Sequence, residues 1–413
     1  MNLASRICTA VLGASLAVLT CFPCVGQDAT TAPPKDKDQE PASSQTAPPA
    51  AAPAAPTPLP TPVTYGPLQL SPPINFEAGP LGKYTINGAV TGIGLFQNNA
   101  VPGNNPQEGA FTNAFIFFQK PTGWFQIYVQ AGAYDLPSLG SAFISNATTN
   151  SDLYGPVPVA YAKLALGKTT SVQFGLLPTL IGAEYTFSFQ NMNVERGLLW
   201  NQENAINRGV QINQTLGKYF SASLSYNDGF YSNRYNWLTG ALTFTTGPHA
   251  VAFTAGGNLG QTTWQSLRTP VQNNGMIYDL IYTFTKGPWV IQPYMQYTDV
   301  PTQPGIGVTQ GASTWGGAIL ASRVLKKGFS LTGRWEYISS SGNLASNSVN
   351  LLYGPGSTAW SITVTPTYQY KKLFARTDIA YVGAGNITPG YAFGSYGLKP
   401  SQTRGVVELG FLF

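Results

Sequence analysis

Residues 360–370 read WSITVTPTYQY, and this stretch decides the fold. Its aromatic and aliphatic side chains alternate strictly with Ser, Thr and Gln. Because successive side chains of a β-strand point to opposite faces, the stretch predicts a strand with one apolar and one polar face. Its length falls within the roughly 9–11 residues of a strand that crosses a bilayer at a tilt.

The same alternation recurs on both sides of this stretch. In 329–337, the side chains of Phe, Leu, Trp and Tyr share one face, and Ser, Thr, Arg and Glu share the other. Segments 289–298, 373–381 and 403–413 follow the same pattern. The sequence therefore predicts a series of amphipathic strands.

The composition excludes an ordinary soluble protein. Of the 413 residues, 9% are charged and 13% are aromatic, whereas roughly 25% of residues are charged in typical soluble domains. A helical membrane protein needs apolar runs of about 20 residues, and only the extreme N-terminus approaches one. The apolar residues are dispersed by alternation instead, which indicates β-structure that faces lipid.

The connections between the strands are of two kinds. Seven links are very short: 120–123, 167–170, 217–218, 246–249, 286–288, 326–328 and 371–372. Every second connection is long and polar: about 97–110, 135–156, 179–206, 227–234, 260–275, 300–313, 340–357 and 385–402. These connections join sixteen strands, so residues 80–413 are predicted to form an all-β, transmembrane, antiparallel up-and-down β-barrel of about 16 strands. The short turns then lie in the periplasm and the long loops lie outside. A soluble β-sandwich gives no reason to keep all short turns at one end.

The charges and the C-terminus fit this prediction. Eight lysines lie in the short turns: Lys120, Lys168, Lys218, Lys286, Lys326, Lys327, Lys371 and Lys372. The last strand ends in Phe413. A terminal Phe on an alternating strand is similar to the signal that the barrel assembly machinery of bacteria recognises, so this machinery is an expected partner. Outer-membrane lipid is another.

Residues 1–26 have the layout of a secretory signal peptide. Arg6 precedes an apolar stretch over 7–22, and a small-residue exit follows. We expect cleavage after Gly26, with lipidation at Cys21 or Cys24 as the alternative. The third cysteine, Cys8, also lies in this segment, so the mature chain holds neither a disulfide nor a thiol.

Residues 27–79 form a Pro/Ala-rich leader. The stretch 41–62 reads PASSQTAPPAAAPAAPTPLPTP, and its prolines favour an extended, disordered chain. Two roles remain open for this segment. It is either a periplasmic linker that contacts the cell wall or a partner, or an inert leader.

A barrel of sixteen to eighteen strands leaves an aqueous channel. The predicted inward rows carry seven charges: Asp279, Arg334, Glu336, Arg376, Asp378, Arg404 and Glu408. Arg334 and Glu336 lie two residues apart, as do Arg376 and Asp378, so each pair can neutralise itself. Bracing of the wall and selection of solutes are both consistent with this pattern.

The third long loop, 179–206, concentrates the remaining charge. It contains Glu184, Glu195, Arg196 and Glu203 beside the apolar stretch 197–200. An apolar patch among charges suits a segment that folds against the inner wall. The hypothesis is that this loop narrows the pore, and the alternative is an ordinary surface loop.

Part of this region resembles a known family. Residues 172–188 (VQFGLLPTLIGAEYTFS), 191–198 (NMNVERGL), 207–211 and 224–229 are similar to the β-barrel porins of the OmpL-like family. The positions that match its pattern are Gly175, Pro178, Gly182, Glu184 and Asn227-Asp228-Gly229. The resemblance implies an outer-membrane channel of loosely defined substrate. The Pro/Ala-rich leader is not part of the pattern.

The sequence argues against catalysis and cofactors. His249 is the one histidine, it lies in a short turn, and the mature chain has no cysteine, so we expect no catalytic site, no metal and no cofactor. No basic patch interleaved with aromatic residues suggests nucleic acid. The expected function is passive diffusion of small hydrophilic solutes and ions across the bacterial outer membrane. The alternative is a barrel-anchored structural or adhesive protein without conductance, and a homo-oligomer is possible in either case.

The charge balance predicts weak ion selectivity. Residues 80–413 carry 19 basic and 12 acidic side chains, and eight of the basic ones are the turn lysines. The remaining charges are close to balance. The lumen is therefore expected to favour neither cations nor anions strongly.

Overall fold

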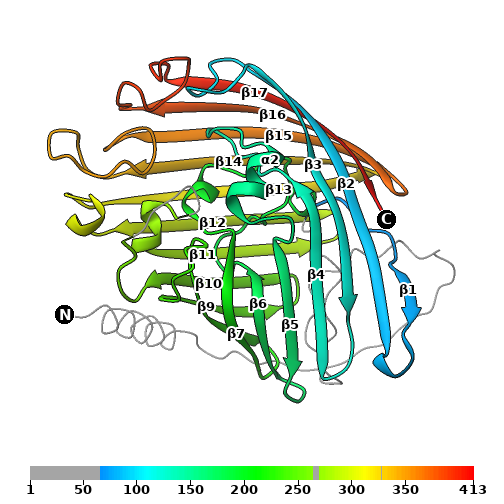
Figure 1. Cartoon of the computed structure of the whole chain (residues 1–413). Coiled ribbons are helices and arrows are strands. Elements are labelled where there is room, and N and C mark those ends of the chain that lie inside the picture. Colours follow the sequence, from blue (N-terminus) through cyan, green and yellow to red (C-terminus); the bar gives the residue numbers. More distant parts are fainter. Residues whose placement is uncertain (1–65, 264–268, 327) are drawn as a thin grey trace, which may run out of the picture. The chain divides into compact units, whose positions relative to one another are not determined.

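The computed structural model describes residues 66–263, 269–326 and 328–413. The described chain is almost entirely β-structure (Figure 1). Its strands are β1 (Ile74–Glu77), β2 (Lys83–Gln97), β3 (Gln107–Lys120), β4 (Phe125–Tyr134), β5 (Val159–Ala165), β6 (Thr170–Pro178), β7 (Ile206–Leu216), β8 (Phe220–Asn227), β9 (Trp237–Thr246), β10 (His249–Asn258), β11 (Met276–Lys286), β12 (Trp289–Val300), β13 (Ala312–Lys326), β14 (Phe329–Ser340), β15 (Thr358–Tyr370), β16 (Leu373–Gly385) and β17 (Ser401–Leu412).

Within the part of the chain that the structure describes, short helical turns occur only in the connections between these strands. They are η1 (Gly79–Leu81), α2 (Asn146–Thr148), η2 (Thr149–Leu153), η3 (Ser188–Gln190), η4 (Leu199–Gln202), η5 (Val271–Asn274) and η6 (Pro304–Ile306). Among the described residues, no helix is both long enough and apolar enough to span a membrane.

The sheet closes on itself. Consecutive strands from β2 to β17 pair antiparallel, and β17 pairs in turn with β2, from Arg404 opposite Gln97 to Leu412 opposite Ala89. Figure 1 shows these two strands side by side, in red and blue. The extra strand β1 pairs with the beginning of β2, beyond the end of β17. The predicted antiparallel barrel of sixteen strands is confirmed, with one additional strand that the sequence did not predict.

The connections follow the predicted asymmetry. The seven short turns join β3 to β4, β5 to β6, β7 to β8, β9 to β10, β11 to β12, β13 to β14 and β15 to β16. We call their side of the barrel the short-turn end. The eight long connections alternate with these turns and lie at the opposite end. Of the turn lysines, Lys327 lies outside the described residues.

Strand β15 shows how the sequence produces the two faces of the wall. Trp360, Ile362 and Val364 are exposed on the outside, whereas Ser361 and Thr363 between them are buried on the inside. In this barrel, then, the apolar rows face outward and the polar rows face inward. A soluble protein has the reverse arrangement. The polar and charged side chains of the strands therefore lie in the interior of this barrel.

Candidate channel constriction

The connection between β6 and β7, residues 179–205, is buried. We call it the inner loop. Most residues from 181 to 205 are buried and none is in the exposed class, and the loop contains the two short helical turns η3 and η4. An exposed surface loop would not have this burial.

Arg334 of β14 joins the inner loop to the wall. Its Nη1 lies 2.8 Å from Glu184 Oε1 and donates to the Glu195 carbonyl at 2.7 Å. Its Nε lies 3.3 Å from Glu336 Oε2 on the same strand. Glu336 Oε1 accepts from the backbone N–H of Leu199. The predicted ion pair of Arg334 with Glu336 is present. The ion pair of Arg334 with Glu184, which connects the wall to the inner loop, is shorter.

Arg376 of β16 bonds both the next strand and the loop. Its Nε lies 2.5 Å from Glu408 Oε2 on β17, and its Nη2 donates to the Ser188 carbonyl at 2.6 Å. Among the described ion pairs, Arg376 has Glu408 as its partner rather than Asp378, with which the sequence had paired it. The reason is geometric. Directly opposed residues of neighbouring strands are about 4.5–5.5 Å apart, closer than residues two apart along one strand, and Arg376 is opposite Glu408.

Asp378 receives the loop backbone instead. Its two carboxylate oxygens accept from the N–H groups of Val194 and Glu195, at 3.1 and 2.8 Å. Arg404 of β17 also contacts the inner loop. Its Nη1 lies 2.7 Å from Glu195 Oε1. The same nitrogen donates to the carbonyl of Ser138, in the connection between β4 and β5. A second long connection therefore also reaches the wall.

Two neighbouring carboxylates, Glu203 of the inner loop and Asp279 of β11, form a further contact between the loop and the wall. Glu203 Oε1 accepts from Gln296 Nε2 at 2.8 Å, and Asp279 Oδ2 accepts from the N–H of Gly182 at 3.0 Å. Gly182 has φ +84°, and a Cβ there would overlap the Glu203 carboxylate, so glycine permits this close approach. Burial, together with the Asp279 carboxylate, raises the pKa of Glu203 well above its usual range.

Arg196 lies at the turn of the inner loop. Its guanidinium donates to the Thr186 carbonyl at 2.7 Å and stacks 4.6 Å from the centre of the Trp200 ring. Burial lowers the pKa of Arg196 to about 10, and it raises the pKa of Asp135 well above its usual range. The field of each charge partly opposes the shift of the other.

All eleven residues predicted for the pore thus lie in one array between the inner loop and the wall. None of them is more than 6% exposed. A buried ion pair contributes little net stability, but removal of one partner costs about 3–5 kcal/mol because the other charge is left uncompensated. The array therefore fixes the position of the loop strongly.

A further segment inside the barrel was not predicted. Residues 66–71, which we call the entry segment, precede β1. Leu68 is 1% exposed and belongs to the apolar cluster that includes Phe117 of β3 and Phe189 of the inner loop. The Ser71 hydroxyl donates to the Leu412 carbonyl at 3.0 Å, and a Cβ on Gly66 would overlap the Asn191 carbonyl of the inner loop. The segment therefore runs from the short-turn end to the inner loop. No periodicity in the sequence marks it.

The opposite part of the inner wall is hollowed. A cavity of about 360 Å³ lies against the inward faces of β5, β6, β7 and β8 and reaches the turn at 167–170. Leu180 of the inner loop lines one side of it, and Lys163, Gln173 and Gln211 line the other. Sequence analysis missed these residues because amides and a single lysine on alternating strands carry no motif.

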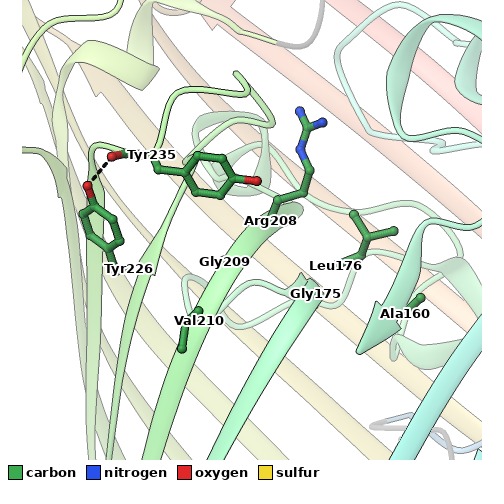
Figure 2. A pocket seen from close by; sticks show the side chains of 8 residues that line it. All are labelled: Ala160, Gly175, Leu176, Arg208, Gly209, Val210, Tyr226 and Tyr235. Carbon is green, nitrogen blue, oxygen red and sulfur yellow. Dashed lines mark hydrogen bonds between the residues drawn. The ribbon is translucent and has the colours of Figure 1, made fainter. Parts of the chain in front are cut away.

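A second hollow, of about 400 Å³, lies on the outer face. Its lining includes the outward-facing Val210 and Tyr226, and the Tyr226 hydroxyl donates to the Tyr235 carbonyl (Figure 2). Arg208 is the charged residue of this lining, and its Nε lies 2.8 Å from Asp228 Oδ2. This depression faces away from the lumen.

Neither histidine nor a metal cluster contributes to the array. The ring of His249 lies at the short-turn end, with Nδ1 2.7 Å from the Tyr282 hydroxyl oxygen. Within residues 66–263, 269–326 and 328–413, no group of three or more His, Cys, Asp and Glu side chains is arranged to hold a metal ion.

A closed sixteen-stranded antiparallel barrel with an apolar exterior, a polar interior and long loops at one end defines the class of outer-membrane β-barrel proteins. The family model described as "Putative beta-barrel porin-2, OmpL-like" matches residues 83–413. The chain belongs to this family. Its barrel and family are those of the bacterial outer membrane.

Solved structures share this fold at low sequence identity. The outer membrane channel DcaP of Acinetobacter baumannii matches with a TM-score of 0.54 and 10% identity, over 82% of this chain and 99% of that chain. OmpF of Salmonella typhi, in complex with daunomycin, matches with a TM-score of 0.52 and 14% identity, over 80% and 98%. OmpT of Vibrio cholerae matches with a TM-score of 0.52 and 11% identity, over 80% and 98%. These likenesses concern the fold. No protein of curated function matches the sequence.

Proposed function

We propose that the protein is a porin that forms a water-filled channel for passive diffusion of small hydrophilic solutes and ions. The observation that carries the proposal is the hollow between Leu180 and the inner faces of β5 to β8, since it is lined by polar side chains inside a barrel of channel-forming size. The family and the fold of the solved channels support the same assignment.

We propose further that the inner loop narrows this channel. Its contacts with β11, β14, β16 and β17 hold it on one side of the lumen, so solutes pass on the other side, along β5 to β8. In this proposal the eleven charged residues form the fixed side of the constriction and hold its position. Their burial favours this bracing role over direct contact with solutes.

The entry segment is the second element of the narrowing. It occupies the short-turn end beside β2, β15 and β17, where Gln369 accepts from the Gln69 N–H at 2.8 Å. With the short turns in the periplasm, the segment enters the barrel from that side. It belongs to the C-terminal part of the leader expected over 27–79, whereas the signal peptide expected at 1–26 and residues 27–65 of the leader lie outside the described residues.

Substitution of Leu68 by Asp tests the entry segment. An unpaired carboxylate in the apolar cluster around Phe117 is unfavourable by several kcal/mol, so the segment should leave the lumen and the single-channel conductance should rise. Leu81→Asp is the matched control, because Leu81 is 63% exposed. Equal conductance of the Leu68→Asp variant and the unchanged protein would exclude a role of this segment in the narrowing.

A second candidate function is an outer-membrane anchor without conductance. One observation favours it: the inner loop and the entry segment together fill much of the interior with buried side chains. In that case the long external loops would be the working part. The anchor predicts that no ions flow through the barrel, whereas the porin predicts an ion current.

We also infer the partners of the barrel. Lipid contacts the outward apolar rows, and Phe413 of the last strand is the residue that the barrel assembly machinery would recognise. The Phe413 backbone exchanges hydrogen bonds of 2.8 and 3.0 Å with Gly88, and its ring stacks on Phe411. A homo-oligomer is consistent with the fold, and sedimentation of the detergent-solubilised protein would identify it.

Recordings from planar bilayers separate the two functions. The porin predicts stepwise increases of current when the purified full-length protein is added. A correctly folded barrel that inserts into liposomes but gives no steps and admits no small solute would exclude the porin and favour the anchor.

A further inference from the structure

The short-turn end of the barrel carries a set of exposed lysines. Two lysines of the short turns are set apart, because Lys120 Nζ donates to the Thr122 and Phe125 carbonyls at 3.1 and 2.8 Å and Lys168 borders the inner cavity. Five others are exposed, and we call them the basic belt: Lys218, Lys286, Lys326, Lys371 and Lys372. They lie in four different turns.

No acidic residue of the short turns offsets this charge. These turns contain neither Asp nor Glu, and no lysine of the belt takes part in an ion pair of the described residues. The exposed Glu77 of β1 is directly opposite Lys83 of β2, which is not part of the belt. The basic belt is therefore a positively charged surface.

The spacing of the turns lets their charges act together. Neighbouring strands are about 4.7–4.9 Å apart, so the consecutive hairpins from β11 to β16 repeat about every 10 Å. That distance is about the Debye length at 0.1 M salt. The fields of lysines in neighbouring turns therefore overlap.

Aromatic side chains place the basic belt at the membrane interface. Tyr219, Trp289 and Tyr370 lie within three residues of belt lysines in the sequence and are 44%, 38% and 60% exposed. Lys218 Nζ lies 5.1 Å from the centre of the Tyr219 ring, and Lys371 Nζ lies 5.4 Å from the centre of the Tyr370 ring. Exposed aromatic rings flank the apolar band of outer-membrane barrels at the depth of the lipid headgroups. The ammonium groups beside these rings lie at the same depth.

We propose that the basic belt binds the phosphate groups of anionic phospholipids, of the class of phosphatidylglycerol. Lysines next to a membrane-spanning segment attract anionic headgroups, and each ammonium offers three donors to phosphate oxygens. The partner is lipid because the lysines are spread over four turns along the wall, beside rings that face lipid. Since the short turns of outer-membrane barrels lie in the periplasm, the lipid belongs to the periplasmic leaflet. This inference goes beyond the channel function and does not depend on it.

The test uses spin-labelled phosphatidylglycerol and phosphatidylcholine as probes of the full-length protein in phosphatidylcholine vesicles. Electron paramagnetic resonance gives the association constant of each probe at the surface of the barrel. In about 10 mM salt, phosphatidylglycerol should associate about threefold or more strongly than phosphatidylcholine, because the lysines attract its charge. In about 1 M salt the two constants should become nearly equal, because the Debye length falls to about 3 Å.

A pair of double variants locates the binding surface. Lys218→Gln with Lys286→Gln should reduce the preference for phosphatidylglycerol by about half, since it removes two of the five charges. Lys218→Arg with Lys286→Arg should retain it. The matched control is Arg234→Gln with Lys399→Gln, which removes two exposed cations from the connections at the opposite end and should leave the preference unchanged.

Three results would overturn the proposal. They are equal association of the two probes at low salt, a preference that high salt leaves unchanged, and a preference that the two Gln double variants reduce equally. None of these results concerns conductance, so the proposed channel function is tested separately. Because the salt series uses the unchanged protein, a double variant that fails to fold does not protect the proposal.

Discussion

Deletion of residues 190–203 is expected to raise the single-channel conductance about twofold or more, because a sixteen-stranded barrel encloses a wide aqueous channel once its inner obstruction is removed. The deleted residues include most of the groups that meet the wall: the Asn191 and Glu195 carbonyls, the Val194 N–H and the carboxylates of Glu195 and Glu203. Recordings from planar bilayers measure the change directly.

The ion pairs that remain on the wall explain why the barrel should still fold after this deletion. Arg376 keeps Glu408, and Arg334 keeps Glu336, so both cations retain a partner on the strands. Water that enters the vacated space solvates their remaining atoms. The matched control is deletion of 343–347, an exposed part of the connection between β14 and β15, which should leave the conductance unchanged. Equal conductance of the 190–203 deletion and the full chain would refute the narrowing by the inner loop.

Substitution of Arg334 by Met should detach the inner loop without removing any of it. The change leaves Glu184 and Glu336 buried without their cation, and such a loss costs about 3–5 kcal/mol. We expect a lower denaturant concentration at the unfolding midpoint, together with larger and noisier conductance steps as the loop leaves the wall. Both effects have the same cause, the uncompensated carboxylates.

Two further variants identify that cause. The double variant Glu184→Gln with Arg334→Met should recover part of the lost stability, because fewer buried charges are left without a partner. Arg234→Met is the control, since Arg234 is exposed in the connection between β8 and β9. If Arg334→Met changes neither stability nor conductance, the ion pairs do not hold the loop.

Most of the fold could be predicted from the sequence, for a physical reason. A transmembrane strand must show one face to lipid and one to the interior, so alternation along a stretch such as 360–370 is required at nearly every position. The lengths of the connections then give the number of strands and the end on which each turn lies. Strand β1 escaped prediction because its four residues are too few for a period of two to be recognised.

The partners of the charged residues could not be predicted in the same way. Arg376 was paired with Asp378 along the strand, but register places it opposite Glu408, which is 32 residues away in sequence. Register depends on hydrogen bonding between strands, and the sequence of a single strand does not contain it. The entry segment was missed for a related reason, since its burial depends on the apolar cluster that Leu68 contacts inside the closed barrel.

The residues that line the cavity against β5 to β8 could not be predicted from the sequence either. Lys163, Gln173 and Gln211 lie on three strands and are ordinary polar residues in the sequence, yet register aligns them at one height. Conversely, the conspicuous charges at 334–336 and 376–378 are buried under the inner loop. Lys163 and Gln211 are also largely buried, at 8% and 7% exposed, so the two sets differ in what they line, the cavity or the inner loop, rather than in residue type.

The most direct test of a water-filled path beside a covered wall is chemical labelling during single-channel recording. The natural cysteines lie at or before residue 24, so single cysteines can be introduced at Gln173, which lines the hollow, and at Thr363, which lies beneath the inner loop against Arg334. A bulky, charged thiol reagent is predicted to lower the current through the Gln173→Cys channel and to leave the Thr363→Cys channel unchanged. Equal reactivity of the two positions, or a current that modification at residue 173 does not alter, would contradict the account.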